Sequence, residues 1–140
     1  MESRGSSGFT LIEIMVVVVI IGILGAMIVP RIMDRVPQAR VTAAQNDLRA
    51  VANALEMYKM DNFHYPSTDQ GLEALVTKPS GFPEAKNWSP SGYLPKTPID
   101  PWTKPYVYIA TENGFELFSL GADGVEGGEG YDADLHYEPK

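Results

Sequence analysis

The sequence contains no cysteine, only two histidines and few basic residues. Without cysteine, no disulfide can staple the fold of this 140-residue chain, which has room for one modest domain. Its 11 Lys and Arg residues are outnumbered by 18 Asp and Glu residues, which gives a formal net charge of -7. Binding to nucleic acid in general requires clustered basic side chains to neutralise phosphates. We therefore expect no nucleic-acid partner.

A long apolar run lies near the start of the chain, and only Thr10 and Glu13 interrupt it. It covers residues 9–29, and as a helix it would be about 31 Å long, enough to cross a bilayer core. A core helix of a small soluble domain is rarely apolar on all sides. A secretory signal would have a shorter apolar region and a small-residue cleavage site, for which Gly25-Ala26-Met27 is a poor match. The run therefore predicts a membrane span over residues 9–29.

Basic residues flank this span unequally. Arg4 precedes it, whereas Arg31, Arg35 and Arg40 follow it. The positive-inside rule, applied alone, would place the C-terminal part of the chain in the cytoplasm.

Glu13 is a carboxylate in the first turns of the predicted span. A charged side chain at the centre of a membrane helix costs about 2.5–3.5 kcal/mol on insertion scales, and less near the interface. Two interpretations are open. The carboxylate either reaches the lipid headgroups and has no further role, or pairs with a cation inside an assembly, where desolvation strengthens the attraction.

The residues around this carboxylate form a short motif. Ser7-Gly8 precedes Phe9-Thr10-Leu11-Ile12-Glu13 and the apolar run, an arrangement that resembles the N-terminal signal of type IV pilins and pseudopilins. The resemblance implies that residues 1–8 are a leader, cytoplasmic before processing. A prepilin peptidase would cut between Gly8 and Phe9 and methylate the new amino group of Phe9. Glu13 would then pair with the Phe9 amino group of a neighbouring subunit.

Pro30 follows the predicted span directly. Proline removes one helical hydrogen bond and clashes with the preceding turn. The resemblance implies that this stretch takes part in assembly and can unwind when subunits pack. A plain kink at the membrane surface is the alternative.

Residues 30–62 are predicted to continue the helix with an amphipathic pattern. Apolar residues recur at alternating steps of three and four, which is the spacing of one helix face. They are Val41, Ala44, Leu48, Val51, Leu55 and Tyr58. This face is expected to pack against a sheet.

Residues 63–140 are predicted to form the rest of a globular part. A short helix is expected to begin with the capping residues at 68–70, and the six prolines of residues 79–101 indicate a long loop. The aromatic and branched segments Tyr106–Ile109 and Phe115–Leu120 flank turn residues, which predicts a β-hairpin. The fold class is therefore α+β, with a long N-terminal helix on a small antiparallel sheet.

Three further segments resemble the major pseudopilin of bacterial type II secretion systems. They are Gln70–Leu75, Asp100-Pro101-Trp102 and the stretch Ser119–Gly124. The resemblance implies a pilin-like fold and a structural role. The subunit would polymerise into a periplasmic pseudopilus that supports export of folded proteins across the outer membrane.

That resemblance also implies a location and a set of partners. The protein would be a single-pass bacterial inner-membrane protein with a periplasmic C-terminal domain, opposite to the orientation from charge alone. Its partners would be further copies of itself, minor pseudopilins, the inner-membrane assembly platform and prepilin peptidase. A type IV pilin for adhesion or motility is the alternative, although such pilins usually carry a C-terminal disulfide. A membrane-anchored enzyme is remote, because His64 and His136 offer no obvious nucleophile–base pair.

The segment from Gly121 to Lys140 is acidic and rich in glycine. Five of its carboxylates are hard oxygen donors of the kind that Ca²⁺ prefers. They are Asp123, Glu126, Glu129, Asp132 and Asp134. Their spacing differs from the helix-flanked calcium loop, so composition alone leaves a solvated acidic tail equally open.

The resemblance to major pseudopilins implies one structural Ca²⁺ ion in this segment. Its ligands would be the side chains of Asp123, Asp132 and Asp134 together with the backbone carbonyls of Leu120 and Val125. The ion would relieve repulsion among the carboxylates and fold the C-terminus onto the sheet.

Overall fold

The computed structural model describes residues 8–33 and 35–139, and the chain forms two compact units, Met1–Val36 and Pro37–Lys140. The predicted leader therefore lies, apart from Gly8, outside the described residues.

The first unit contains helix α1, Leu11–Met33. Its segment Leu11–Ile28 is long and apolar enough to cross a membrane, and none of that segment is buried inside the protein. The helix thus begins near the predicted start of the span and continues past Pro30 to Met33. Its apolar side chains need a partner outside the chain, either lipid or other protein.

Helix α2, Arg35–Asn62, supplies the amphipathic surface that the sequence predicted. Of the six residues of the predicted stripe, five are buried and Val41 is half-buried. The two helices are separate elements, and the predicted continuity between them depends on Asp34, which is outside the described residues.

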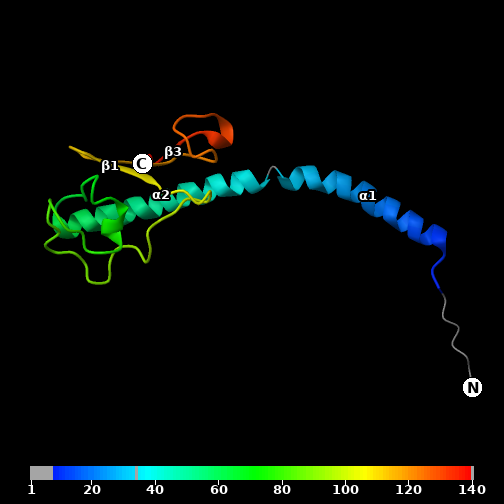
Figure 1. Ribbon diagram of the computed structural model, residues 1–140, viewed down its shortest axis with the longest axis horizontal. Coiled ribbons are helices and arrows are strands. Elements are labelled where there is room, and N and C mark those ends of the chain that lie inside the picture. Colours follow the sequence, from blue (N-terminus) through cyan, green and yellow to red (C-terminus); the bar gives the residue numbers. More distant parts are fainter. Residues whose placement is uncertain (1–7, 34, 140) are drawn as a thin grey trace, which may run out of the picture. The chain divides into compact units, whose positions relative to one another are not determined.

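A three-stranded antiparallel sheet with the order β1-β2-β3 covers one side of α2 (Figure 1). Strands β1, Val107–Thr111, and β2, Gly114–Ser119, form the predicted hairpin, in which Val107 is opposite Phe118 and Thr111 is opposite Gly114. Strand β3, Leu135–His136, pairs with the end of β2 and was not predicted.

The hydrophobic core lies between α2, the sheet and the 3-10 helix η1, Leu72–Leu75. Leu48, Leu55 and Tyr58 of α2 are among its most completely buried members. The buried residues that make up this core all belong to the unit Pro37–Lys140. This unit therefore has its own core and can fold without α1.

The predicted helix at residues 68–75 is shorter than expected. Gly71 has a φ of 59°, so η1 cannot extend back toward Thr68. The predicted loop at 79–101 has no helix or strand of its own apart from an isolated bridge between Ile99 and Pro105. It is nevertheless attached, because the Trp88 indole N–H donates to the Ala74 carbonyl at 2.8 Å.

Candidate functional site

The first candidate site is the start of α1, where Thr10 and Glu13 bond to each other. The Thr10 backbone N–H donates to Glu13 Oε2 at 2.9 Å, and the Glu13 N–H donates to Thr10 Oγ1 at 3.3 Å. This reciprocal pair is a capping box, which satisfies amide groups that have no partner within the helix. The negative charge of Glu13 is also stabilised by the positive end of the helix dipole. The Glu13 carboxylate therefore faces the amino end of its own helix.

The predicted cleavage point lies just outside this helix. Gly8 and Phe9 precede α1, both are exposed, and Phe9 is 85% exposed. The Gly8–Phe9 peptide bond is thus in an open segment, one residue before the amide that Glu13 binds. The capping role of Glu13 was not predicted, although the T-x-x-E spacing of residues 10–13 is its sequence signal.

Pro30 lies inside α1, three residues before the last helical residue, Met33. Because proline carries no backbone N–H, the helix lacks one hydrogen bond at this turn. The helix nevertheless continues through this position.

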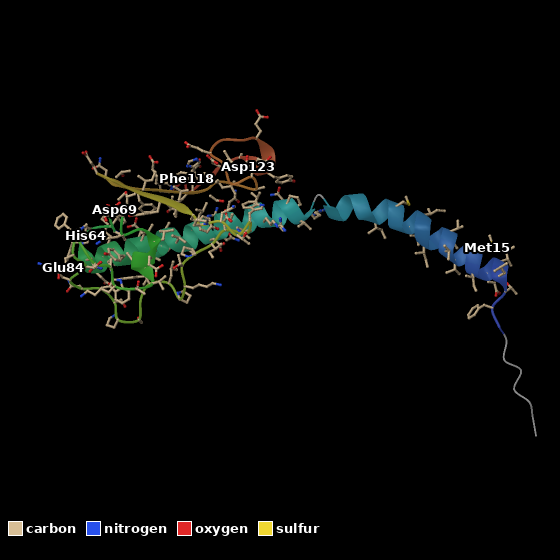
Figure 2. The ribbon with its side chains drawn as sticks, viewed as in Figure 1. Met15, His64, Asp69, Glu84, Phe118 and Asp123 are labelled. Carbon is tan, nitrogen blue, oxygen red and sulfur yellow. The ribbon has the colours of Figure 1, made fainter. Side chains whose placement is uncertain are left out.

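The second candidate site is the acidic loop between Gly121 and Asp134. Asp123, which is labelled in Figure 2, marks this loop at the end of the globular unit where α2 begins. The two arms of the loop touch, since the Ala122 N–H donates to the Tyr131 carbonyl at 3.0 Å. A Cβ at Gly121 would lie 2.9 Å from the Asp132 carbonyl oxygen, so only glycine allows this approach. The 3-10 helix η2, Gly130–Asp132, precedes the returning arm.

Two of the predicted calcium ligands organise this loop. Asp123 Oδ1 accepts the Val125 N–H at 3.0 Å, and Asp134 Oδ2 accepts the Gly127 N–H at 2.9 Å. The other carboxylate oxygen of Asp134, Oδ1, is buried, and no donor from the described residues reaches it. A buried acceptor without a partner costs about 1–3 kcal/mol, and more when it is charged. The Asp134 carboxylate is therefore the group in this loop that most requires a cation.

The remaining predicted ligands do not point to a cation site as clearly as Asp134 does. The Asp132 side chain is exposed, Val125 is exposed, and Leu120 is half-buried at the loop entrance. Within residues 8–33 and 35–139, no three acidic or histidine side chains converge as a metal site. A cation in this loop would therefore take part of its ligands from backbone carbonyls, as Ca²⁺ often does. The residues fit a hard cation of this kind.

Both histidines make structural contacts. The ring nitrogens of His64 lie 3.0 Å from the Tyr65 carbonyl and 3.1 Å from the Glu84 carbonyl. The His136 ring stacks on Phe118 with 4.7 Å between ring centroids. Neither contact has the geometry of a nucleophile–base pair.

An apolar helix that needs an external partner, attached to a small self-contained α+β unit, defines the chain as a membrane-anchored, pilin-like subunit. Residues 31–138 match the family described as "Type II secretion system (T2SS), protein G". Residues 3–29 match the "Prokaryotic N-terminal methylation motif". The chain belongs to the type II secretion system protein G family.

Individual relatives agree with this assignment. The chain is 62% identical over 137 residues to a type II secretion system core protein G of Pseudomonas aeruginosa, with 96% of each chain covered. It is 50% identical over 136 residues to the protein of that name from Vibrio cholerae, which covers 96% of this chain and 92% of the relative.

The fold has a solved counterpart. It is the crystal structure of the major pseudopilin from the type 2 secretion system of enterohaemorrhagic Escherichia coli. That structure matches with a TM-score of 0.64 and 37% identity, covering 74% of this chain and 90% of the other. The predicted α+β pseudopilin fold is confirmed. The family match also extends through the globular unit, beyond the N-terminal signal that type IV pilins share.

Proposed function

We propose that this chain is the main structural subunit of a periplasmic pseudopilus that supports export of folded proteins by a type II secretion system. The observation that carries this proposal is that the apolar helix and the folded core lie in separate parts of the chain. Helix α1 buries none of its apolar segment Leu11–Ile28 in the protein, while the unit Pro37–Lys140 has a complete core. A subunit of this kind can move its helix from lipid into a bundle of identical helices without unfolding.

Assembly would depend on the start of α1. The Glu13 carboxylate already binds a backbone amide at the amino end of its helix. A carboxylate accepts several hydrogen bonds, so it can also bind the Phe9 amino group of a neighbouring subunit. In an apolar helix bundle this pair would be strong, because both charges are removed from water. Pro30, where α1 lacks one hydrogen bond, is the point at which the helix can adjust during packing.

Processing would create that amino group. Prepilin peptidase would cut the exposed Gly8–Phe9 bond and methylate Phe9, a step supported by the match of residues 3–29 to the methylation motif. The N-terminus would be cytoplasmic before cleavage and the C-terminal unit periplasmic. Further partners would be minor pseudopilins and the inner-membrane assembly platform.

The acidic loop would hold one Ca²⁺ ion in a structural role. Asp134 and Asp123 would supply side-chain oxygens, and the carbonyls of Leu120 and Val125 would join them. The Asp132 side chain, which is exposed, would have to turn toward the ion to complete the set. The unpaired buried oxygen of Asp134 supports this proposal. The ion would supply the positive charge that holds the loop closed against β3.

Mass spectrometry of the membrane-extracted protein tests the leading proposal. The expected mature chain begins at Phe9 and carries one extra methyl group on its amino nitrogen. A chain that keeps residues 1–8 in a secreting cell would contradict the processing step and the assembly mechanism that depends on it.

Thermal unfolding of the fragment 35–140 tests the calcium proposal. With calcium at about 100 times its dissociation constant, binding adds about 2.7 kcal/mol. That corresponds to a rise in Tm of about 10 °C or more over the chelated protein. Asp134→Asn should lose this rise, whereas Glu129→Gln, which changes an exposed carboxylate outside the proposed ligand set, should keep it. Equal Tm values with calcium and with chelator would contradict the proposal.

A further inference from the structure

Asp100 is a buried carboxylate, 4% exposed, that precedes a tight turn. Its Oδ1 accepts the backbone N–H groups of Trp102 at 3.0 Å and Lys104 at 2.8 Å. The turn closes through two further bonds, from the Asp100 N–H to the Lys104 carbonyl at 2.8 Å and from the Thr103 N–H to the Asp100 carbonyl at 2.9 Å. Four hydrogen bonds of Asp100, two through its side chain and two through its backbone, therefore hold the segment 100–104.

The second carboxylate oxygen of Asp100 faces the acidic loop. Ser119, which is fully buried at the end of β2, donates its hydroxyl to Asp100 Oδ2 at 2.7 Å. The same hydroxyl oxygen accepts the N–H of Gly121 at 3.2 Å. Two hydrogen bonds thus connect Asp100 to the first residue of the loop.

Gly121 is in turn the point where the two arms of the loop meet. Its φ is 69°, and a Cβ here would lie 2.7 Å from the Ala133 carbonyl oxygen and 2.9 Å from that of Asp132. Moving Gly121 therefore displaces the arm that carries Asp132 and Asp134. Leu120, between Ser119 and Gly121, is the proposed carbonyl ligand.

The segment 100–104 touches the loop at a second place. A Cβ at Gly124 would lie 3.3 Å from the Lys104 Cε atom, so the Lys104 side chain covers the loop next to Asp123. The backbone of Lys104 is held by Asp100. Asp100 therefore bonds to Ser119, which leads to the first of these contacts, and to the backbone of Lys104, whose side chain makes the second.

We propose that Asp100 is a positioning residue for calcium binding, acting through Ser119 on the entrance of the acidic loop. This inference depends on the calcium site of the proposed function. Holding Ser119 and Gly121 in place keeps the Leu120 carbonyl and the returning Asp132–Asp134 arm in the arrangement that receives the ion. Coupling between two sites is reciprocal, so calcium must also stabilise the segment 100–104.

Asp100→Asn is the sharpest variant because it keeps the size of the side chain. An amide can still accept the Trp102 and Lys104 bonds through its oxygen, but its NH₂ group would face the Ser119 oxygen. The Ser119 hydroxyl could then no longer donate to position 100. The expected result is a calcium dissociation constant raised about tenfold, within the usual range of coupling between sites.

Asp47→Asn is the matched control in the same fragment, 35–140. Asp47 is a half-buried carboxylate on α2 that accepts the Tyr106 hydroxyl at 3.0 Å, and within the described residues it makes no hydrogen bond to Ser119 or to the acidic loop. Calorimetric titration with calcium should give Asp47→Asn the same dissociation constant as the wild-type fragment. This should hold even if the two variants lose the same amount of stability, measured as Tm in chelator. A purely structural role for Asp100 would make the two variants alike.

The outcomes are separable. A wild-type fragment that binds no calcium overturns both the calcium proposal and this inference. A wild-type fragment that binds calcium while Asp100→Asn binds equally well overturns the inference alone. Where Asp100→Asn does not fold, hydrogen exchange of the wild-type fragment decides. Calcium should slow exchange of the Trp102 and Lys104 amides more than that of core amides far from the loop, and slowing that is no greater at these two amides overturns the inference.

Discussion

Helices α1 and α2 both contain many apolar residues, but the two helices differ in whether the protein itself buries those residues. In α1 the apolar residues surround the helix, and the segment Leu11–Ile28 has no buried residue within the protein. In α2 one face is a stripe of apolar residues that is buried under the sheet and η1, and only Val36, Met57 and Met60 are large apolar residues exposed elsewhere on this helix. The distribution of apolar residues, more than their number, therefore decides whether a helix finds its partners in its own chain or outside it.

This difference separates assembly from stability. Changes in α1 should affect the membrane and filament states and leave the globular unit folded. Changes in α2 should unfold the globular unit first. Each of the following predictions tests that separation.

The largest effect is expected from Glu13→Ala. The variant should insert and be processed, but filaments and secretion should fall by about tenfold or more, the factor that about 1.4 kcal/mol of lost contact energy produces. The Tm of the globular unit should not change. Immunoblots of subunits cross-linked in intact cells and assays of an exported protein, in cells that lack the wild-type chain, provide the measurement.

Glu112→Ala is the control for this prediction, because it removes an exposed carboxylate from the hairpin turn of the globular unit. It should assemble and secrete normally. Normal secretion by Glu13→Ala would remove Glu13 from the mechanism and leave its capping box as a purely local feature.

Leu55→Ala should have the next largest effect, on stability. Leu55 is fully buried in the core, and truncating such a residue typically costs about 2–5 kcal/mol. Ile20→Ala removes similar apolar volume from α1, where Ile20 is 50% exposed. In the full-length chain in detergent, Ile20→Ala should change the free energy of unfolding of the globular unit by less than about 0.5 kcal/mol. Denaturant titration measures both, and equal losses would contradict the separation of the two units.

Much of this architecture could be predicted because it depends on local periodicity. The stripe of α2 follows the helical repeat, and the hairpin of β1 and β2 follows from branched residues around a turn. Strand β3 could not be predicted, because its two residues show no pattern and pair only after the acidic loop returns to β2.

The candidate sites likewise divide into features that a local pattern reveals and features that appear only in the folded structure. Glu13 was found from its position in an apolar run, because a carboxylate there is unusual in any fold. The unpaired oxygen of Asp134 could not be distinguished among several acidic residues by composition. The role of Asp100 depends on Ser119, 19 positions away in the chain, and only the folded structure brings them together.

The smallest effect is expected from alkaline pH, and it should be confined to the globular unit, because α1 contains no tyrosine. Burial raises the pKa of Tyr58 and of Tyr65 to about 12, and it also raises the pKa of Tyr106 and Tyr108. Tyrosine in an unfolded chain has a pKa of about 10. Above that pH the unfolded state binds fewer protons than the folded state, so stability must fall as pH rises from about 10 toward 12.

Tyr58→Phe sharpens this last prediction. The Tyr58 hydroxyl is buried, and within the described residues it has no hydrogen-bond partner. Its removal should therefore be neutral or slightly stabilising at neutral pH, because no bond is lost and an unpaired polar group is removed. The variant should also lose less stability between pH 10 and about 12, because one group with a raised pKa is gone. Thermal unfolding of fragment 35–140 at neutral pH and between pH 10 and about 12 measures both effects. A clear loss of stability at neutral pH would show that the hydroxyl has a bound partner, and the alkaline response would then have to come from the other buried tyrosines.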